Sequence, residues 1–153
     1  MTKTKNKAKF LITLLLVSCK LLSQKNETII NTFTQHTFEI SHEIKLIPKE
    51  IKKAYFNRFN ERLVLAAPGK PYNPTDLISD RYPRRRLIYL STFPIAGMGF
   101  IFYEIGGIVK QNILMIYYYK PNIIFKNFLI EAEGLDYQNL VKYLIENKIY
   151  LIE

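Results

Sequence analysis

The sequence is poor in the residues that most often carry catalysis and metal binding. Its 153 residues include one cysteine, two histidines and no tryptophan. With no second cysteine available for pairing, a folded domain must owe its stability to core packing rather than to disulfides. The histidines, His36 and His42, lie close to Glu39 and Glu43, but their spacing matches no compact zinc motif. We therefore interpret both as solvated strand-edge residues, keep a metal site as the lesser alternative, and expect no cofactor.

Common catalytic signatures are missing as well. The sequence contains no phosphate-binding loop, dinucleotide fingerprint, serine elbow or Asp-rich calcium loop. The formal net charge is +9, yet the basic residues are spread along the chain without the context of a recognition helix. We expect no nucleic-acid partner, and the residues alone identify neither a reaction nor a ligand.

The N-terminal segment lacks acidic residues and has only a short apolar run. Four lysines lie among the first nine residues, and residues 10–17 are apolar apart from Thr13. This run is too short to span a bilayer, which takes about 20 apolar residues, so a permanent transmembrane helix is the poorer interpretation. A basic start, a short apolar run and the small Ser18 that follows it are typical of a secretory signal.

The end of this signal resembles the lipobox of bacterial lipoproteins. The segment Leu16-Val17-Ser18-Cys19 has the aliphatic first position, the small third position and the final cysteine of that motif. The resemblance covers only the signal segment. It implies cleavage before Cys19, a diacylglycerol on the Cys19 sulfur and an acyl chain such as palmitate on its new amine. Two or three acyl chains hold a soluble domain on a membrane, where one chain anchors only marginally.

These features predict the organisation and location of the chain. We expect a lipoprotein signal peptide over residues 1–18, a tether over 19–26 and a single domain over 27–153. The protein would then lie in the cell envelope, lipid-anchored on the periplasmic or surface side of a bacterial membrane. Two alternatives remain open: an ordinary secretory signal cleaved near residues 22–24, and an intracellular protein.

The middle of the chain predicts a β-meander. Residues 84–119 hold three runs of β-branched and aromatic residues, separated by glycine-containing turns at 94–97 and 106–107. Both faces of the run at 112–119 are apolar, so we expect that strand to be covered on both sides. The remaining strands are expected at 87–93, 98–105, 123–130 and 149–152, with one more within 27–44.

Two amphipathic segments predict helices that cover this sheet. Apolar residues recur at helical spacing over 48–60 and 136–147, with Pro48 in the first turn of one helix and Asp136 as the N-cap of the other. The predicted fold is therefore α+β, an antiparallel β-meander sheet of about four to six strands covered by two helices.

A charged cluster marks the junction of the meander with a long loop. Residues 68–83 contain four prolines and read as a surface loop, a kind of segment that is often functional. Arginine forks bind carboxylate and phosphate groups in a bidentate manner. The favoured interpretation is an internal Arg–Asp network that fixes the loop, and the alternative is a site for an anionic ligand or partner. The residues of this cluster are Asp76, Asp80, Tyr82, Arg84, Arg85 and Arg86.

One carboxylate falls within the apolar meander. Glu104 lies near the end of an otherwise apolar run, before the double glycine, and a buried carboxylate needs a partner. Folding about the turn at 94–97 brings it near residue 87, so an arginine of the 84–86 run is the expected partner. Glu104 and Asp76 are also the lesser candidates for acid–base catalysis, since no nucleophile–base pair accompanies them.

The leading functional interpretation is a non-enzymatic binding module of the bacterial envelope. Its expected partners are the membrane, through the lipid anchor, and an anionic ligand or envelope protein, through the loop up to Arg86. The alternatives are a small envelope hydrolase or glycan-modifying enzyme that uses Glu104, Asp76 or a histidine, and an inhibitor or immunity-type protein that blocks a toxin or enzyme.

Overall fold

The computed structural model describes residues 28–75, 81–107, 110–119, 122–146 and 150–152. It divides into two units, residues 1–35 and 36–153. Cys19, the signal segment and the tether lie outside the described residues, so the lipobox stays a prediction. Within the described ranges, no helix has both the length and the apolarity that crossing a membrane requires.

The first unit corrects one expectation. Residues 28–34 form a helix, whereas the threonine and isoleucine content of residues 27–44 predicted a strand. The strand found within that range is a short one at Ile40–Ser41, in the second unit. The hydroxyl of Thr32 donates to the carbonyl of Thr28 at 2.8 Å, a back-bond that threonine makes within helices. The helical spacing is visible in the apolar residues Ile29, Ile30 and Phe33, which lie three and four positions apart. The strand prediction followed the β-propensity of the residues instead of this spacing.

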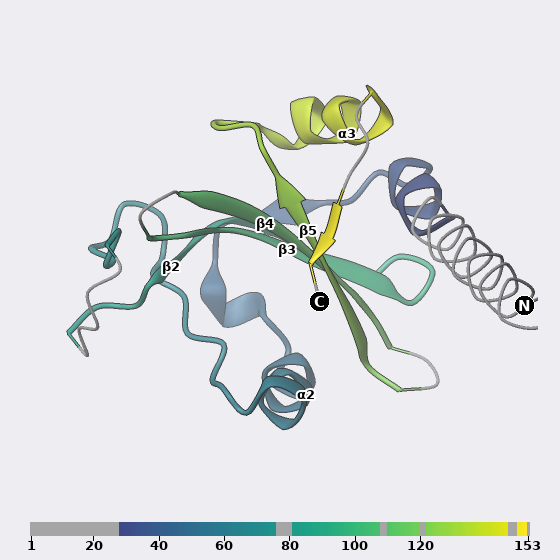
Figure 1. Cartoon of the computed structure of the whole chain (residues 1–153). Coiled ribbons are helices and arrows are strands. Elements are labelled where there is room, and N and C mark those ends of the chain that lie inside the picture. The colour runs from purple at the N-terminus through teal and green to yellow at the C-terminus, as the bar shows by residue number, and fades with distance from the viewer. Residues whose placement is uncertain (1–27, 76–80, 108–109, 120–121, 147–149, 153) are drawn as a thin grey trace, which may run out of the picture. The chain divides into compact units, whose positions relative to one another are not determined.

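The second unit is an antiparallel meander with helices on either side (Figure 1). Six strands follow one another in the sheet in chain order, each antiparallel to its neighbours. The predicted α+β fold is confirmed. The elements are β1 (Ile40–Ser41), the short 3-10 helix η1 (Ile44–Leu46), α2 (Lys49–Phe59), β2 (Arg85–Ser91), β3 (Met98–Ile105), β4 (Gln111–Tyr118), β5 (Ile124–Ile130), α3 (Tyr137–Glu146) and β6 (Tyr150–Ile152).

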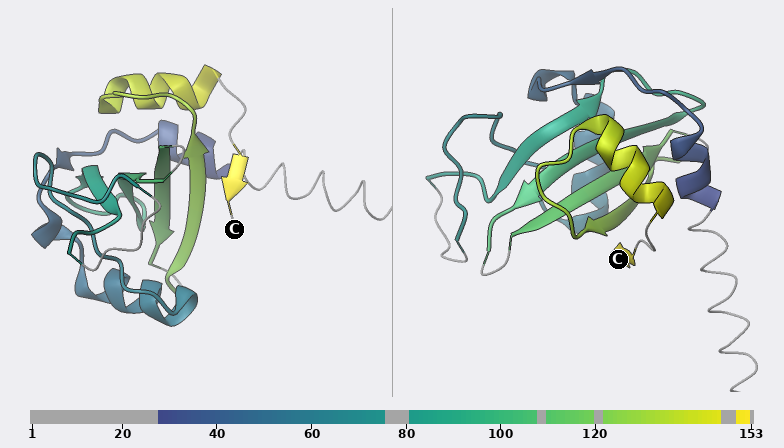
Figure 2. Two further views of the ribbon diagram at one scale, coloured as in Figure 1. Left: turned by 60° about the vertical axis from the view of Figure 1, so that its left-hand side comes forward. Right: turned by 90° about the horizontal axis from the view of Figure 1, so that it is seen from above.

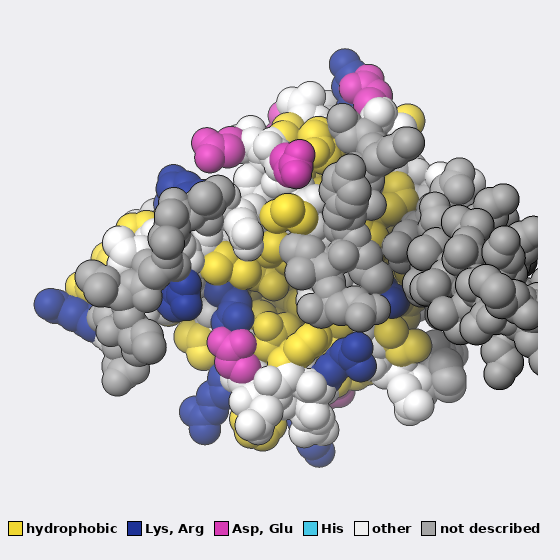
Figure 3. Space-filling model, in the orientation of Figure 1, with side chains coloured by type: hydrophobic (Ala, Val, Ile, Leu, Met, Phe, Trp, Pro, Cys, Tyr) yellow, Lys and Arg dark blue, Asp and Glu magenta, His cyan; other side chains and the backbone are white. Residues whose placement is uncertain are grey.

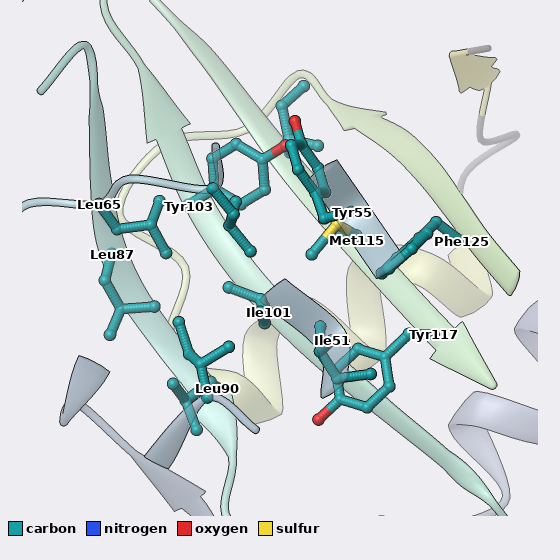
Figure 4. Close-up of a cluster of buried hydrophobic side chains, with 13 residues drawn as sticks. Ile51, Tyr55, Leu65, Leu87, Leu90, Ile101, Tyr103, Met115, Tyr117 and Phe125 are labelled. Carbon is teal, nitrogen blue, oxygen red and sulfur yellow. The ribbon is translucent and has the colours of Figure 1, made fainter. Parts of the chain in front are cut away.

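Helix α2 covers one face of the sheet. Pro48 occupies its N-cap, and Asn60 ends it in the left-handed conformation at φ 51°. Ile51 and Tyr55 point from the helix into side chains of the central strands, as Figure 4 shows. The sheet contributes the following buried residues to this cluster: Leu87, Leu90, Ile101, Tyr103, Ile113, Met115, Tyr117 and Phe125.

Helix α3 lies on the opposite face, as two further views confirm (Figure 2). The predicted N-cap is confirmed, because the Asp136 carboxylate accepts the backbone N–H of Asn139 at 2.8 Å. At the start of α3, the Tyr137 ring stacks on Phe100 of β3 at 5.9 Å between ring centroids. Strand β4 is therefore covered on both sides, and residues 113–117 are all buried, as its two apolar faces predicted.

Candidate functional site

The charged residues that the sequence singled out meet at one end of the sheet, where β2 begins and β3 ends. Arg86 lies directly opposite Glu104 in the β2–β3 pairing, and Arg85 lies opposite Ile105. Neighbouring residues of a strand point to opposite faces, so Arg85 and Arg86 serve different sides of the sheet. We call the group on the α3 side, Tyr72, Arg84, Arg86, Glu104 and Lys110, the charged rim.

Glu104 is the centre of the charged rim. Its side chain is 10% exposed, and one carboxylate oxygen accepts a hydrogen bond from Arg86 Nη2 at 3.0 Å. The other oxygen accepts from the Tyr72 hydroxyl and lies 3.9 Å from Lys110 Nζ. The Arg86 guanidinium also lies over the Tyr72 ring, 4.5 Å from its centroid. The expected pairing of Glu104 with an arginine of the run is confirmed.

These partners decide the charge state of Glu104. Burial disfavours the charged carboxylate, but the hydrogen bonds from Tyr72 and Arg86 and the nearby cations outweigh burial and hold the pKa of Glu104 below its ordinary value. Glu104 is therefore ionised at neutral pH and has no proton to donate. Burial and the same hydrogen bond raise the pKa of Tyr72, which keeps that hydroxyl protonated as a donor. The arrangement is that of a satisfied ion pair rather than of a general acid.

The long loop is fastened to this end of the sheet through its backbone. The N–H of Asn73 donates to the carbonyl of Pro83 at 2.7 Å, and the N–H of Gly107 donates to the carbonyl of Pro74 at 3.0 Å. Gly106 makes this contact possible, since a Cβ there would lie 2.3 Å from the Asn73 carbonyl oxygen. The described part of the loop is thus held at both of its ends.

The other two arginines of the run are also engaged within the domain. Arg85 makes a bidentate pair with Glu61, at 2.8 and 2.9 Å, on the α2 side of the sheet. Arg84 donates from Nη2 to the carbonyl of Gly106 at 3.2 Å. All three arginines therefore make contacts within the domain, whereas the predicted pairing with Asp76 and Asp80 falls on residues that the structure does not describe and stays a prediction.

Of the carboxylates that pair with the arginine run, Glu104 was expected and Glu61 was not. Asp76 and Asp80 lie outside the described residues, and the carboxylates that the structure pairs with the run are Glu61 and Glu104. Glu61 and Tyr72 were missed by the sequence reasoning. Glu61 lies 24 positions before its arginine, and no periodicity connects residues so far apart. The nearest available signal was that a buried arginine at a strand start requires an acid on the same face.

The histidines take no part in the charged rim. The His42 Nδ1 lies 2.6 Å from the carbonyl oxygen of Ile88, and its ring meets the edge of Tyr89. His42 is exposed and His36 is half-buried, in the segment on either side of β1. Among the described residues, no three His, Cys, Asp or Glu side chains gather into a possible metal site.

The surface of this end is cationic and carries an aromatic side chain. Figure 3 shows Lys and Arg side chains around the loop at the left of the molecule. Tyr82 is 38% exposed, and the Arg81 guanidinium lies 5.3 Å from the centroid of its ring. Tyrosine and arginine are the residues most often enriched at the energetic centres of protein interfaces.

Comparison with known protein families, with curated protein sequences and with solved structures yields no match to this chain. Functional conclusions therefore rest on the residues themselves.

Proposed function

We propose that this protein is a lipid-anchored module of the bacterial envelope that binds a partner without catalysing a reaction. The partner contacts the loop of residues 68–86 and the charged rim beneath it. The lipobox-like segment that ends at Cys19 supports the anchor. The contacts of Glu104 support a binding role over a hydrolytic one.

The state of Glu104 is the observation that carries this proposal. A glycan-cleaving acid needs a raised pKa so that it holds a proton at neutral pH, and it needs a second carboxylate across the scissile bond. Glu104 has the opposite property, because its pKa is lowered and both of its oxygens have donors. Glu104 holds the loop in place, and a loop held in one conformation presents a preorganised binding surface.

The anchor is tested by metabolic labelling with a palmitate analogue and by the intact mass of the mature chain. We expect label on the native protein and a mature mass that corresponds to an acylated chain beginning at Cys19. The Cys19→Ala variant should carry no label and should keep residues 1–18, because the proposed cleavage depends on the modified cysteine. Undiminished label on the variant would contradict a lipid on Cys19.

The binding surface is tested by co-purification of the tagged full chain from detergent-solubilised envelope. Tyr82→Ala should abolish recovery of the partner, while Phe56→Ala should not. Phe56 is a suitable control because it is an aromatic residue of similar exposure, 46% against 38%, on helix α2. Equal recovery with both variants would place the partner elsewhere. Replacing Arg84 and Arg86 together with alanine should destabilise the domain, since both hold the loop.

A further inference from the structure

The end of the sheet opposite the charged rim has a different character. The turn between β2 and β3 carries Phe93, whose side chain is 69% exposed, followed by the exposed Pro94. At the same end of the sheet, Ile124 at the start of β5 is 47% exposed, and Tyr119, just after β4, is half-buried. A backbone hydrogen bond from Tyr119 to the carbonyl of Gly97, at 2.9 Å, joins the two turns. We call Phe93, Pro94, Tyr119 and Ile124 the apolar end.

A hydrogen-bonded hairpin turn follows Phe93 and Pro94. Ile95 and Met98 exchange two backbone hydrogen bonds, at 2.8 and 2.9 Å. Ala96 and Gly97 between them both have positive φ, 52° and 75°, as the two central residues of a tight hairpin turn require. A large apolar side chain held outward by a fixed backbone loses little conformational freedom on binding.

The chain enters the second unit at His36 and Phe38, which contact Tyr137, and then reaches this turn at Glu39. The N–H of Thr92 donates to the carbonyl of Glu39 at 2.9 Å, and its hydroxyl lies 3.2 Å from the Glu39 carboxylate. Thr92 is the residue before Phe93, and Glu39 is the fourth residue of the unit. Near the start of the second unit, Glu39 therefore lies beside the apolar end, whereas the charged rim lies at the far end of β2.

We propose that the apolar end inserts into the surface of the bilayer that holds the lipid anchor, with Phe93 as the deepest residue. This inference rests on the proposed lipid anchor. Aromatic rings with a polar tip favour the membrane–water interface, which suits Tyr119 at the same end of the sheet as the inserting Phe93. Acyl chains and an apolar protein surface reinforce one another, because the first contact raises the local concentration of the second. The charged rim then faces away from the membrane, toward a partner.

The absence of tryptophan makes this arrangement measurable. Phe93→Trp and Tyr82→Trp each introduce the only tryptophan of the chain, at opposite ends of β2. The seven residues of β2 alone separate the two sites by roughly 23 Å at about 3.3 Å per residue. Both sites are exposed aromatics, so both variants should fold, and an unchanged melting temperature verifies this. Each acylated full chain is reconstituted into phosphatidylethanolamine–phosphatidylglycerol vesicles, with and without brominated acyl chains.

We expect Phe93→Trp to show a blue-shifted emission in vesicles and several-fold stronger quenching by brominated lipid than Tyr82→Trp. A tryptophan at 93 that stays open to aqueous acrylamide, on a chain whose mass shows the acyl groups, overturns the insertion and leaves the proposed anchor intact. Equal quenching of both reporters also overturns it. Acrylamide protection at 93 without lipid identifies a second copy or a protein as the occupant instead, and a chain without acyl groups refutes both proposals.

Discussion

At the scale of single residues, the charged rim explains why a carboxylate can lie near the end of an otherwise apolar strand, β3. A buried ion pair repays its desolvation only when the geometry is good and the remaining lone pairs have donors. Glu104 meets this condition through Arg86 on one oxygen and Tyr72 on the other. Removing the charge leaves these donors facing a neutral group, so the cost is larger than that of an exposed pair.

Glu104→Gln should lower the free energy of unfolding by about 1–3 kcal/mol, the range for a hydrogen-bonded buried charge. Glu146→Gln is the control, because Glu146 also pairs with a cation, Lys142 at 4.0 Å, but the two side chains are 58% and 71% exposed. That change should cost less than about 1 kcal/mol. Urea unfolding at neutral pH measures both. Equal costs would show that burial does not distinguish the two pairs.

The same pair of proteins gives a pH test. The pKa of Glu104 is lowered in the folded state, so its ionised form adds stability above the unfolded pKa of about 4.3. That contribution is lost as the pH falls through the folded pKa. The difference in unfolding free energy between the native chain and Glu104→Gln should be constant from pH 6 to 8 and shrink below about pH 4. A difference that grows toward acid would mean that the folded pKa is raised.

Much of the charged rim was predictable at this scale, and the reason is local. An antiparallel turn fixes which residues face each other, so the pairing of Glu104 with an arginine followed from counting back across the 94–97 turn. Tyr72 and Glu61 were not predictable, because their positions depend on how an irregular loop returns to the sheet. No repeating pattern encodes that return.

At the scale of elements, the close contact between the loop and the β3 end depends on one glycine. A Cβ on Gly106 would lie 2.3 Å from the Asn73 oxygen and 2.5 Å from the Pro74 Cα. Both are backbone atoms, so the contact cannot be relieved by a change of rotamer. Only a displacement of the loop makes room for the side chain.

Gly106→Ala should therefore destabilise the domain by at least about 1–3 kcal/mol, as overpacking does, and should expose the loop to protease. Trypsin cleavage after Arg81 and the urea midpoint measure the two effects. Gln111→Ala is a nearby control, since Gln111 is exposed at the start of β4 and should change stability by less than about 0.5 kcal/mol. Unchanged cleavage after Arg81 would contradict a loop that is held by this contact.

The elements themselves show where the sequence pattern was sufficient. The meander, both covering helices and the doubly buried β4 were predicted, because each segment contains a long run of regularly spaced apolar residues. The helix at 28–34 was missed, since threonine and isoleucine favour strands while their spacing here is helical. Strand β2 begins at Arg85, two residues earlier than expected. The prediction began the strand at its first apolar residue, whereas Arg85 and Arg86 already pair with residues of β3.

At the scale of the second unit, residues 36–153, stability is shared between two apolar layers that the sheet separates. Ile51 of α2 is fully buried on one face. Ile130 of β5, which is 1% exposed, pairs with Asn112 on the other face. Within the described part of the unit there is no cysteine, so these layers and the hydrogen-bonded sheet between them must act together.

Ile51→Val and Ile130→Val test whether the two layers form one cooperative core. Each change removes one buried methylene group and should cost about 0.5–1.5 kcal/mol. The two sites share no contact, so the costs should add in the double variant to within about 0.5 kcal/mol, with a single urea transition seen by circular dichroism and by tyrosine fluorescence. Transitions that separate between the two probes would mean that each face of the sheet unfolds on its own. Matching transitions and additive costs would mean that the α2 and α3 layers unfold as one cooperative unit. A partner bound at the charged rim would then stabilise both layers.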